Sequence, residues 1–244
     1  MEAAAYHSLR DLQDRHWWFV GRRAIVARLI RTFARLPERP RILEAGCGYG
    51  GNLAMLAQFG DIDAFELDDD ARAYASLRAP RQVAPGLLPD RIGFEGERFD
   101  LIAMLDVLEH VEDDHGALVA LRQRLGVDGS ILITVPALPW LWSAHDAIHH
   151  HHRRYTRAGL DRLLRQAGYA PASIGYFNGL LFPLAMAQRL AARLTRAAGK
   201  PDTMPGPWLN RLLGGVFRLE RHLVGRIGLP IGLSLYAVAR PARQ

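Results

Sequence analysis

The stretch Arg41-Ile-Leu-Glu-Ala-Gly-Cys-Gly-Tyr-Gly-Gly-Asn-Leu53 decides the fold of this chain of 244 residues. It begins with a short apolar run that ends in an acid, passes through a glycine cluster and then resumes as an expected helix. Glycine lets the backbone turn tightly and approach a ligand without a Cβ clash, and the N-terminus of the following helix faces that ligand. The stretch therefore predicts a nucleotide-cofactor loop after a buried strand.

The glycine spacing leaves two cofactors open. Gly46, Gly48 and Gly51 match the dinucleotide pattern, whereas Gly46, Gly48 and Gly50, placed after Glu44, suit an S-adenosylmethionine loop. The next apolar run, 62–65, ends at Glu66, where a carboxylate can bind the ribose diol that both cofactors carry. We predict that Glu66 contacts the ribose, which argues against a 2′-phosphate.

A third segment favours one of the two. Residues 99–106 have the pattern of a buried strand, and Val107-Leu-Glu-His-Val111 follows as a turn. Together with the acidic glycine motif and Glu66, this segment resembles class I S-adenosylmethionine-dependent methyltransferases, of the broad group that includes quinone O-methyltransferases. The resemblance covers roughly 41–169 and implies S-adenosylmethionine as cofactor. A nicotinamide oxidoreductase, or a cofactor-binding methyltransferase-like protein without turnover, is the alternative.

The cofactor brings a sulfonium cation and an ammonium group but no phosphate, so acids at the carboxyl ends of parallel strands suit it. The alternative for Asp68 to Asp70 is that they only cap the next helix, which applies above all to Asp69 and Asp70. The resemblance and the motifs together predict these cofactor-binding residues: Trp18, Arg22, Glu44, Gly46, Cys47, Gly48, Gly50, Asn52, Glu66, Leu67, Asp68, Gly86, Leu87, Asp106 and Val107.

Two parts of this prediction come from the flanks of the motif. The segment 15–23 joins two expected helices and resembles a lid, in which Arg22 meets the cofactor carboxylate; the alternative is that Trp17 and Trp18 only bury apolar area.

Many relatives carry an acid that receives the adenine amino group. This chain has none at 84–89, so we expect backbone groups of Gly86 and Leu87 to take its place.

A histidine-rich loop, 135–156, should overhang the methyl-transfer site. Similar methyltransferases carry a histidine shortly before an Arg-Arg-Tyr-Thr-like sequence, which places His151 or His150 there. Histidine suits removal of a hydroxyl proton, so the predicted catalytic residues are His110, His145 and His151, with Asp146 orienting one of them. The alternative is that these histidines only lie at helix ends or on the surface and take no part in catalysis. The usual spacings of metal ligands are absent, so we predict no metal. The alternative is a weakly bound divalent ion that assists an acceptor oxygen through Glu109, His110 or Asp146.

The alternation of strands and helices predicts an α/β fold: a Rossmann-like, seven-stranded, mostly parallel sheet with an antiparallel last strand and helices on both faces. We expect one domain, composed of a helical lid (1–38), the core (39–177), a helical insertion (178–229) and the last strand with its tail (230–244). Expected strands are 41–45, 62–66, 81–84, 99–105, 129–135, 171–177 and 231–240; expected helices are 6–18, 22–36, 51–59, 69–78, 113–125 and 157–167.

The insertion before the last strand is basic. Residues 171–244 carry ten Lys and Arg against two acids, about +8, although the whole chain is +6. Arg189, Arg193 and Arg196 share one helical face. The arginines are either generic surface residues, or contacts with an anionic membrane, or part of a substrate lid or homodimer contact. We favour the last two together, with Phe177, Leu181, Phe182, Trp208 and Phe217 entering the membrane interface.

The expected acceptor is therefore a small or lipid-linked molecule, and no motif for reading nucleic acid accompanies the basic charge. No leader or membrane-spanning stretch is visible, which predicts a cytoplasmic protein that can associate peripherally with the inner face of the membrane. Cys47, the single cysteine, lies in the glycine loop, where we expect a small lining residue before a reactive thiol.

Overall fold

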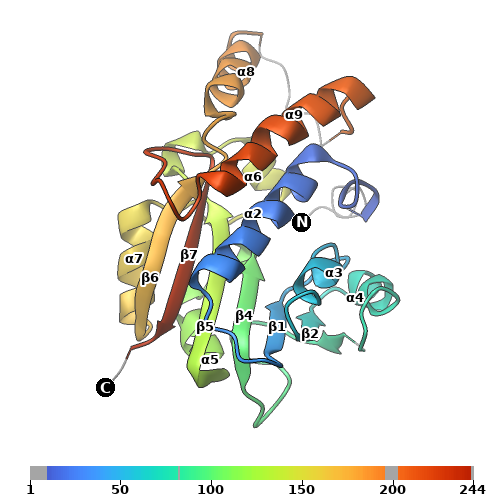
Figure 1. The fold of residues 1–244 in the computed structure, drawn as a ribbon. Helices are drawn as coiled ribbons and strands as arrows, with labels where there is room; N and C mark the ends of the chain where they lie inside the picture. Colours follow the sequence, from blue (N-terminus) through green and yellow to red (C-terminus); the bar gives the residue numbers. More distant parts are fainter. Residues whose placement is uncertain (1–9, 82, 196–202, 243–244) are drawn as a thin grey trace.

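The structure is a computed structural model that describes residues 10–81, 83–195 and 203–242. It contains a seven-stranded sheet in the order β3-β2-β1-β4-β5-β7-β6 (Figure 1). The pairs among the first five strands are parallel, and β7 is antiparallel to both β5 and β6. The predicted fold class is therefore confirmed. The strands are β1 (Arg41–Ala45), β2 (Asp61–Glu66), β3 (Ala84–Pro85), β4 (Phe99–Leu105), β5 (Leu125–Pro136), β6 (Tyr169–Phe177) and β7 (Ser234–Pro241).

Helices cover both faces of the sheet, each over its own apolar core. The α2 helix packs on one face, where Ile25 and Leu29 join Ile42 and Leu132 of the sheet. On the other face, α5 and α7 bury leucines against the alternate side chains of β4 and β5. The helices are α2 (Trp17–Phe33), α3 (Leu53–Leu56), α4 (Asp69–Ser76), α5 (Asp114–Arg122), α6 (Ala144–Ile148), α7 (Arg157–Gln166), α8 (Phe182–Thr195) and α9 (Pro207–Leu219); the 3-10 turns are η1 (Leu108–His110), η2 (Pro139–Leu141) and η3 (Glu220–His222).

Several predicted boundaries were wrong. The strand expected at 81–84 is reduced to β3, and the one expected at 231–240 starts only at Ser234. The break between the N-terminal helices lies at 13–16, so Trp17 to Arg23 belong to α2, whose N-cap His16 accepts a hydrogen bond from the Trp18 amide. The helix expected at 51–59 is reduced to α3 because the glycine turn extends to residue 52. The β5 strand starts at Leu125 rather than residue 129, since Leu125 already pairs with Phe99.

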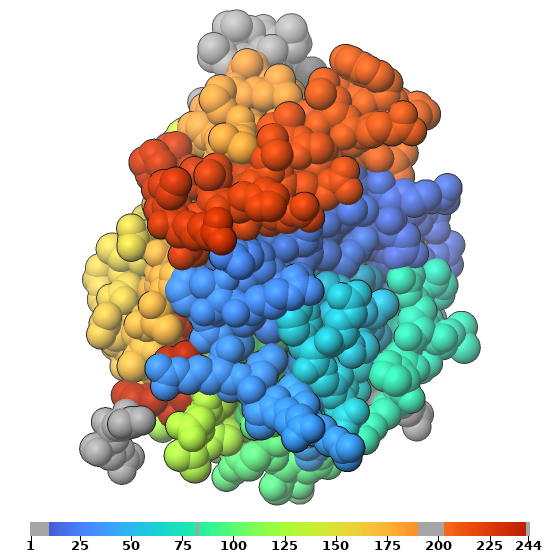
Figure 2. All heavy atoms as spheres, viewed as in Figure 1, coloured from blue at the N-terminus to red at the C-terminus, as the bar shows by residue number. Residues whose placement is uncertain are grey.

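The insertion is docked on the N-terminal helix (Figures 1 and 2). Phe217 of α9 is fully buried, and its ring lies 5.6 Å from the Trp17 ring and 6.4 Å from the Phe177 ring. The Asn210 side chain accepts from the Trp17 amide at 2.8 Å. A Cβ on Gly21 would lie 2.3 Å from the Phe217 ring, so the small residue permits this close approach. One end of the cofactor cleft is thus built from two segments far apart in sequence.

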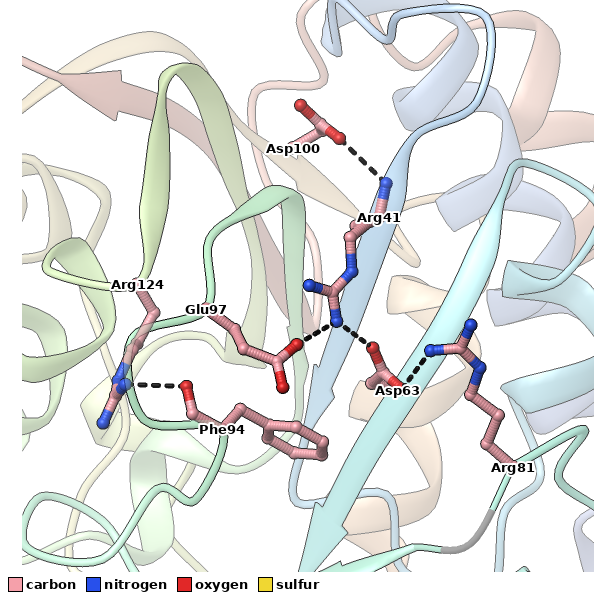
Figure 3. A network of polar contacts seen from close by, with 7 residues as sticks. All are labelled: Arg41, Asp63, Arg81, Phe94, Glu97, Asp100 and Arg124. Atoms are coloured by element: carbon pink, nitrogen blue, oxygen red, sulfur yellow. Dashed lines mark hydrogen bonds and ion pairs between the residues drawn. The ribbon is translucent and has the colours of Figure 1, made fainter.

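An ion-pair network ties the strands together at the opposite, amino end of β1 (Figure 3). The Arg41 guanidinium pairs with Asp63 of β2, at 2.7 Å, and with Glu97, while its amide donates to Asp100 at 2.8 Å. Arg81 bonds the second Asp63 oxygen at 3.3 Å. This network therefore links neighbouring strands at the edge of the sheet opposite to the carboxyl ends of the parallel strands.

Candidate active site

A cleft of about 2500 Å³ lies at the carboxyl ends of the parallel strands. The glycine loop, the first turns of α2, the turn after β4, the histidine-rich loop and parts of α8 and α9 line it. Open α/β sheets bind ligands at this edge. Among the described residues, no helix is long and apolar enough to cross a membrane.

The glycine loop has the shape that its sequence predicts. Gly46, Gly48 and Gly50 have φ values of 71°, 53° and 75°, a left-handed conformation that side chains with a Cβ rarely adopt. The amides of Gly46 and Cys47 both donate to the Phe65 carbonyl at 3.1 Å, which fixes the loop against β2. Burial raises the pKa of the Cys47 thiol, so this residue lines the loop as a thiol rather than a thiolate.

Glu66 faces the cleft from the end of β2. Its carboxylate accepts hydrogen bonds from the amides of Gly48, Leu67 and Asp68, at 2.7, 2.9 and 3.0 Å. These donors hold the carboxylate next to the glycine loop, in the position where the ribose is expected. Asp68 also lines the cleft, but its side chain caps α4 by accepting from the Ala71 amide at 2.8 Å. The helix cap is therefore Asp68, whereas Asp69 and Asp70 lie in the first turn of α4.

A buried polar network lies beneath the cleft. Glu44 is 1% exposed and does not line the cleft; it accepts from the Asn52 side chain at 2.8 Å, and Asn52 reaches the surface of the cleft in its place. The Arg22 guanidinium pairs with Asp106 and lies 3.5 Å from the Asn52 side-chain oxygen. It also lies over the Trp18 ring, 4.7 Å from its centroid.

Burial shifts the pKa values of two charged residues of this network, Glu44 and Arg22. It raises the pKa of Glu44 to about 7 and lowers the pKa of Arg22 to about 10. The second oxygen of Glu44 and the Nε of Arg22 are buried without a hydrogen-bond partner. Such a network holds Arg22 and Asp106 in fixed positions at the cleft surface.

The adenine side of the cleft differs from the sequence expectation in detail. Gly86 and Leu87 both line the cleft. An adenine amino group donates, so a backbone carbonyl would have to receive it. The Leu87 carbonyl already accepts from the Arg91 amide at 2.7 Å, while the Gly86 amide donates to the Glu66 carbonyl at 3.2 Å. Asp90, which the sequence analysis missed, is exposed and also lines the cleft. The sequence signal that could have placed Asp90 at the cleft is its position in a short loop, one residue after Pro89.

The histidine loop brings three of the predicted catalytic residues together. Asp146 is fully buried and accepts from the Arg154 guanidinium at 2.7 Å, while the Nδ1 of His151 lies 3.0 Å from the same oxygen. Burial would raise the pKa of Asp146, but the bonds from His151 and Arg154 outweigh it and hold that pKa well below its usual range. The His145 ring lies 6.5 Å from the His151 ring.

His110 lies at the end of η1, and its ring is 4.7 Å from the His151 ring. Burial, followed by the neighbouring histidines, lowers the pKa of His110 to about 3, so its imidazole is neutral. The preceding residue, Glu109, lines the cleft, is 1% exposed and has its pKa raised to about 8 by burial. Sequence analysis gave Glu109 no catalytic or cofactor role and named it only as one alternative ligand of a divalent ion; its burial was not expected, because an acid in a turn is usually exposed.

Two further residues at the cleft carry no motif. Gln13 is buried and donates to the Tyr49 carbonyl at 3.3 Å, and a Cβ on Gly51 would lie 2.6 Å from its side-chain oxygen. Asn178, at the end of β6, has a φ of 58° and a buried side-chain oxygen without a partner. Asparagine tolerates this conformation better than most residues, but sequence alone does not locate it in a cleft.

Comparison with known proteins identifies the family. Residues 16–174 match the family model described as a methyltransferase domain. An uncharacterized protein of Synechococcus sp. is 36% identical over 119 residues, which are 42% of this chain and 27% of that protein. The chain therefore spans only about a quarter of that relative.

Solved structures share the fold at low identity. A TehB-like S-adenosylmethionine-dependent methyltransferase from Corynebacterium glutamicum has a TM-score of 0.53 at 21% identity, over 89% of this chain and 87% of that one. A geranyl diphosphate C-methyltransferase from Streptomyces coelicolor has a TM-score of 0.57 at 14% identity, over 88% and 78%. A methyltransferase from Archaeoglobus fulgidus has a TM-score of 0.55 at 17% identity, over 89% and 93%.

Proposed function

The chain belongs to the methyltransferase domain family and is a class I S-adenosylmethionine-dependent enzyme, and we propose that it methylates an oxygen of a small or lipid-linked acceptor. The family match decides between the two cofactors that the glycine motif leaves open. The observation that supports methylation of oxygen is the histidine cluster at the cleft, since a hydroxyl acceptor must lose a proton.

The reaction is an in-line displacement. The acceptor oxygen forms a bond to the methyl carbon while the bond from that carbon to the sulfonium sulfur breaks, which leaves S-adenosylhomocysteine. The hydroxyl proton leaves the acceptor. The cofactor supplies the activated methyl group, so the protein has to hold the two reactants in line and accept or relay that proton.

We assign the proton acceptor to His151. Asp146 bonds its Nδ1, which leaves the Nε2 as the basic nitrogen, and a buried carboxylate that fixes a histidine tautomer is a recurrent arrangement in general base catalysis. Arg154 holds Asp146 in place through an ion pair. His145 is exposed and lines the cleft, where it can pass the proton to solvent.

The outer face of α9 supports delivery of the acceptor from a membrane surface. Trp208 is 73% exposed, and Leu212 and Leu219 follow it on the same side of the helix. Arg211 and Arg218 are exposed beside this apolar stripe. Exposed apolar side chains next to arginines suit an anionic membrane interface.

The cleft itself continues this apolar surface. Leu184 of α8 and Leu209 of α9 are exposed and also line the cleft, so an apolar path leads from the outer face of α9 to the cofactor site. A lipid-linked acceptor could reach the methyl group along it. A neighbour of this fold is a geranyl diphosphate C-methyltransferase, so this fold accommodates an isoprenoid acceptor in that protein.

Several residues expected to enter the membrane do not. Phe177, Leu181 and Phe217 are buried in the core, because α9 turns their side of the insertion toward α2. The Arg189 side chain donates to the Leu141 carbonyl and lines the cleft. The Arg193 side chain and Arg196 lie outside the described part of the chain.

The function is tested first by calorimetric titration with S-adenosylhomocysteine, with NADH as the control. Binding of the former alone, followed by transfer of a labelled methyl group to phenolic or lipid acceptors, is the expected result. Replacement of His151 by Ala should abolish most transfer while leaving cofactor affinity intact. Cofactor binding without transfer to any acceptor would favour a methyltransferase-like protein without turnover.

Membrane association is tested by sedimentation with anionic vesicles. The wild type should sediment with phosphatidylglycerol vesicles at low salt and less at high salt. A Trp208→Glu, Leu212→Glu variant should stay in solution. Val127→Glu is the matched control, since Val127 is also an exposed apolar residue but lies near the amino end of β5. If the wild type does not sediment, or if it forms a dimer through this face, the membrane proposal fails.

A further inference from the structure

Three side chains that can bind a metal converge at the cleft. One ligand atom from each of Glu109, His110 and His151 lies within 4.8 Å of the others. Two of them are adjacent on η1, and the third comes from the loop before α7. All three line the cleft, so an ion held between them would be accessible to a bound acceptor.

The carboxylate of this cluster lacks a partner. The Oε2 of Glu109 is fully buried, and no hydrogen bond reaches it. A buried carboxyl oxygen without a hydrogen-bond partner costs free energy, and native structures usually provide a partner for such an atom. A bound cation would satisfy Glu109 where no protein donor does.

Both imidazoles are already oriented by partners outside the cluster. The Nδ1 of His151 is bonded to Asp146, which leaves the Nε2 for a metal. The His110 ring is hydrogen-bonded to the backbone of His150, which occupies one of its two nitrogens. Histidine ligands of metals typically donate their second N–H to a carboxylate or a backbone carbonyl, and both arrangements occur here.

We propose that Glu109, His110 and His151 bind a divalent transition-metal ion of the Zn²⁺ class in the methyl-transfer cleft. Two imidazole nitrogens and one carboxylate oxygen suit Zn²⁺, Co²⁺ or Fe²⁺, whereas Mg²⁺ and Ca²⁺ prefer oxygen ligands. Tetrahedral ligands of Zn²⁺ lie about 3.3 Å apart, so small side-chain rotations would close the cluster around the ion. Three protein ligands leave one position open, as in catalytic zinc sites.

The open position gives the ion a role in the reaction, and this role rests on the proposed function. An acceptor hydroxyl bound there would lose its proton more readily, because the cation stabilises the oxyanion that attacks the methyl group. His151 would then be a ligand instead of the proton acceptor, and the proton would leave to solvent. The sequence does not reveal this site, because about forty residues separate His151 from the other two ligands.

The test uses the full chain without a histidine tag, after treatment with a chelator. Calorimetric titration with Zn²⁺ should give one saturable site, and Co²⁺ should give a visible absorption band that Zn²⁺ abolishes. Glu109→Gln and His151→Ala should each weaken Zn²⁺ binding by more than 100-fold, and Asp146→Asn by about 10- to 100-fold, as for other partners of metal ligands. Mg²⁺ should not compete.

His115→Ala is the matched control, because His115 is exposed on α5 and does not line the cleft. Its Zn²⁺ affinity should equal that of the wild type, and thermal melts should show that Glu109→Gln remains folded. Absence of a saturable site in the wild type, or undiminished binding by folded Glu109→Gln, would overturn the proposal. S-adenosylhomocysteine titration of the same samples separates the two hypotheses: its binding without metal binding overturns the ion alone, whereas its absence overturns the proposed function.

Discussion

Replacing Glu66 by Ala is the sharpest test of the cofactor site. Its carboxylate accepts from the amides of Gly48, Leu67 and Asp68, so it is held at the junction of the glycine loop and the end of β2. If the ribose diol binds there, its hydroxyls donate to a negatively charged acceptor that the backbone has already positioned. The variant removes that acceptor, together with the bonds that the carboxylate accepts from the three amides.

The expected loss follows from the number of hydroxyls that bind. A hydrogen bond to a charged group contributes about 1.5–3 kcal/mol, and 1.36 kcal/mol changes an equilibrium constant tenfold. One hydroxyl therefore corresponds to about a 10- to 150-fold rise in the dissociation constant of S-adenosylhomocysteine, and two hydroxyls to about 150-fold or more. The carboxylate also holds the amides of the loop, and the variant loses these bonds as well. The measured loss of affinity should therefore exceed ten-fold.

The assay is calorimetric titration with S-adenosylhomocysteine, alongside thermal melts. Glu66→Gln serves as a second variant, since it keeps the shape of the side chain and removes only the charge. Asp61→Ala is the matched control, because this acid is exposed at the amino end of the same strand. An affinity within three-fold of the wild type in folded Glu66→Ala and Glu66→Gln would refute the ribose assignment.

Three other substitutions probe the loop and the insertion. Gly46→Ala should cost about 1–2 kcal/mol of backbone strain and weaken cofactor binding in calorimetry, because φ is 71° and its Cβ would lie 3.0 Å from Val107; unchanged affinity would contradict this. Phe217→Ala should lower the free energy of unfolding in urea by about 3–5 kcal/mol, since the ring is fully buried; a loss below about 1 kcal/mol would show that α9 is not docked as described. Burial raises the pKa of Glu220, so the folded chain binds this proton more tightly than the unfolded chain, and the contribution to stability falls as pH rises through that raised pKa. The stability of the wild type relative to Glu220→Gln, measured in urea titrations, should therefore fall as the pH rises above the ordinary pKa of glutamate, and a constant difference would argue against the shift.

Much of the sheet and of the cofactor edge could be predicted because the signal is local. Apolar runs that end at Glu44, Glu66 and Asp106 are strand endings, and parallel strands bring such endings to one edge. The left-handed glycines of the loop were equally predictable, since no other residue adopts that conformation as readily. Local pattern and fold agree there.

The rest depends on contacts between distant segments. Nothing near Trp17 indicates that Asn210 and Phe217 will cover it, because those residues lie about two hundred positions later. The histidine run was visible, but the left-handed conformation of His150, with φ of 53°, determines which neighbouring rings turn toward His110. The burial of Glu109 likewise arises only when the loop folds over η1.

The way in which the insertion leaves the sheet has a consequence for how such enzymes diversify. The Leu233 amide donates to the Asn178 carbonyl at 3.2 Å, and Glu220 closes the same corner by accepting from the amides of Asn178 and Leu180, at 2.5 and 2.7 Å. Residues 179–232 thus start and finish within one hydrogen bond of each other. A short turn could therefore join β6 to β7 directly. The segment between them could be replaced by another one without changing the connectivity of the sheet.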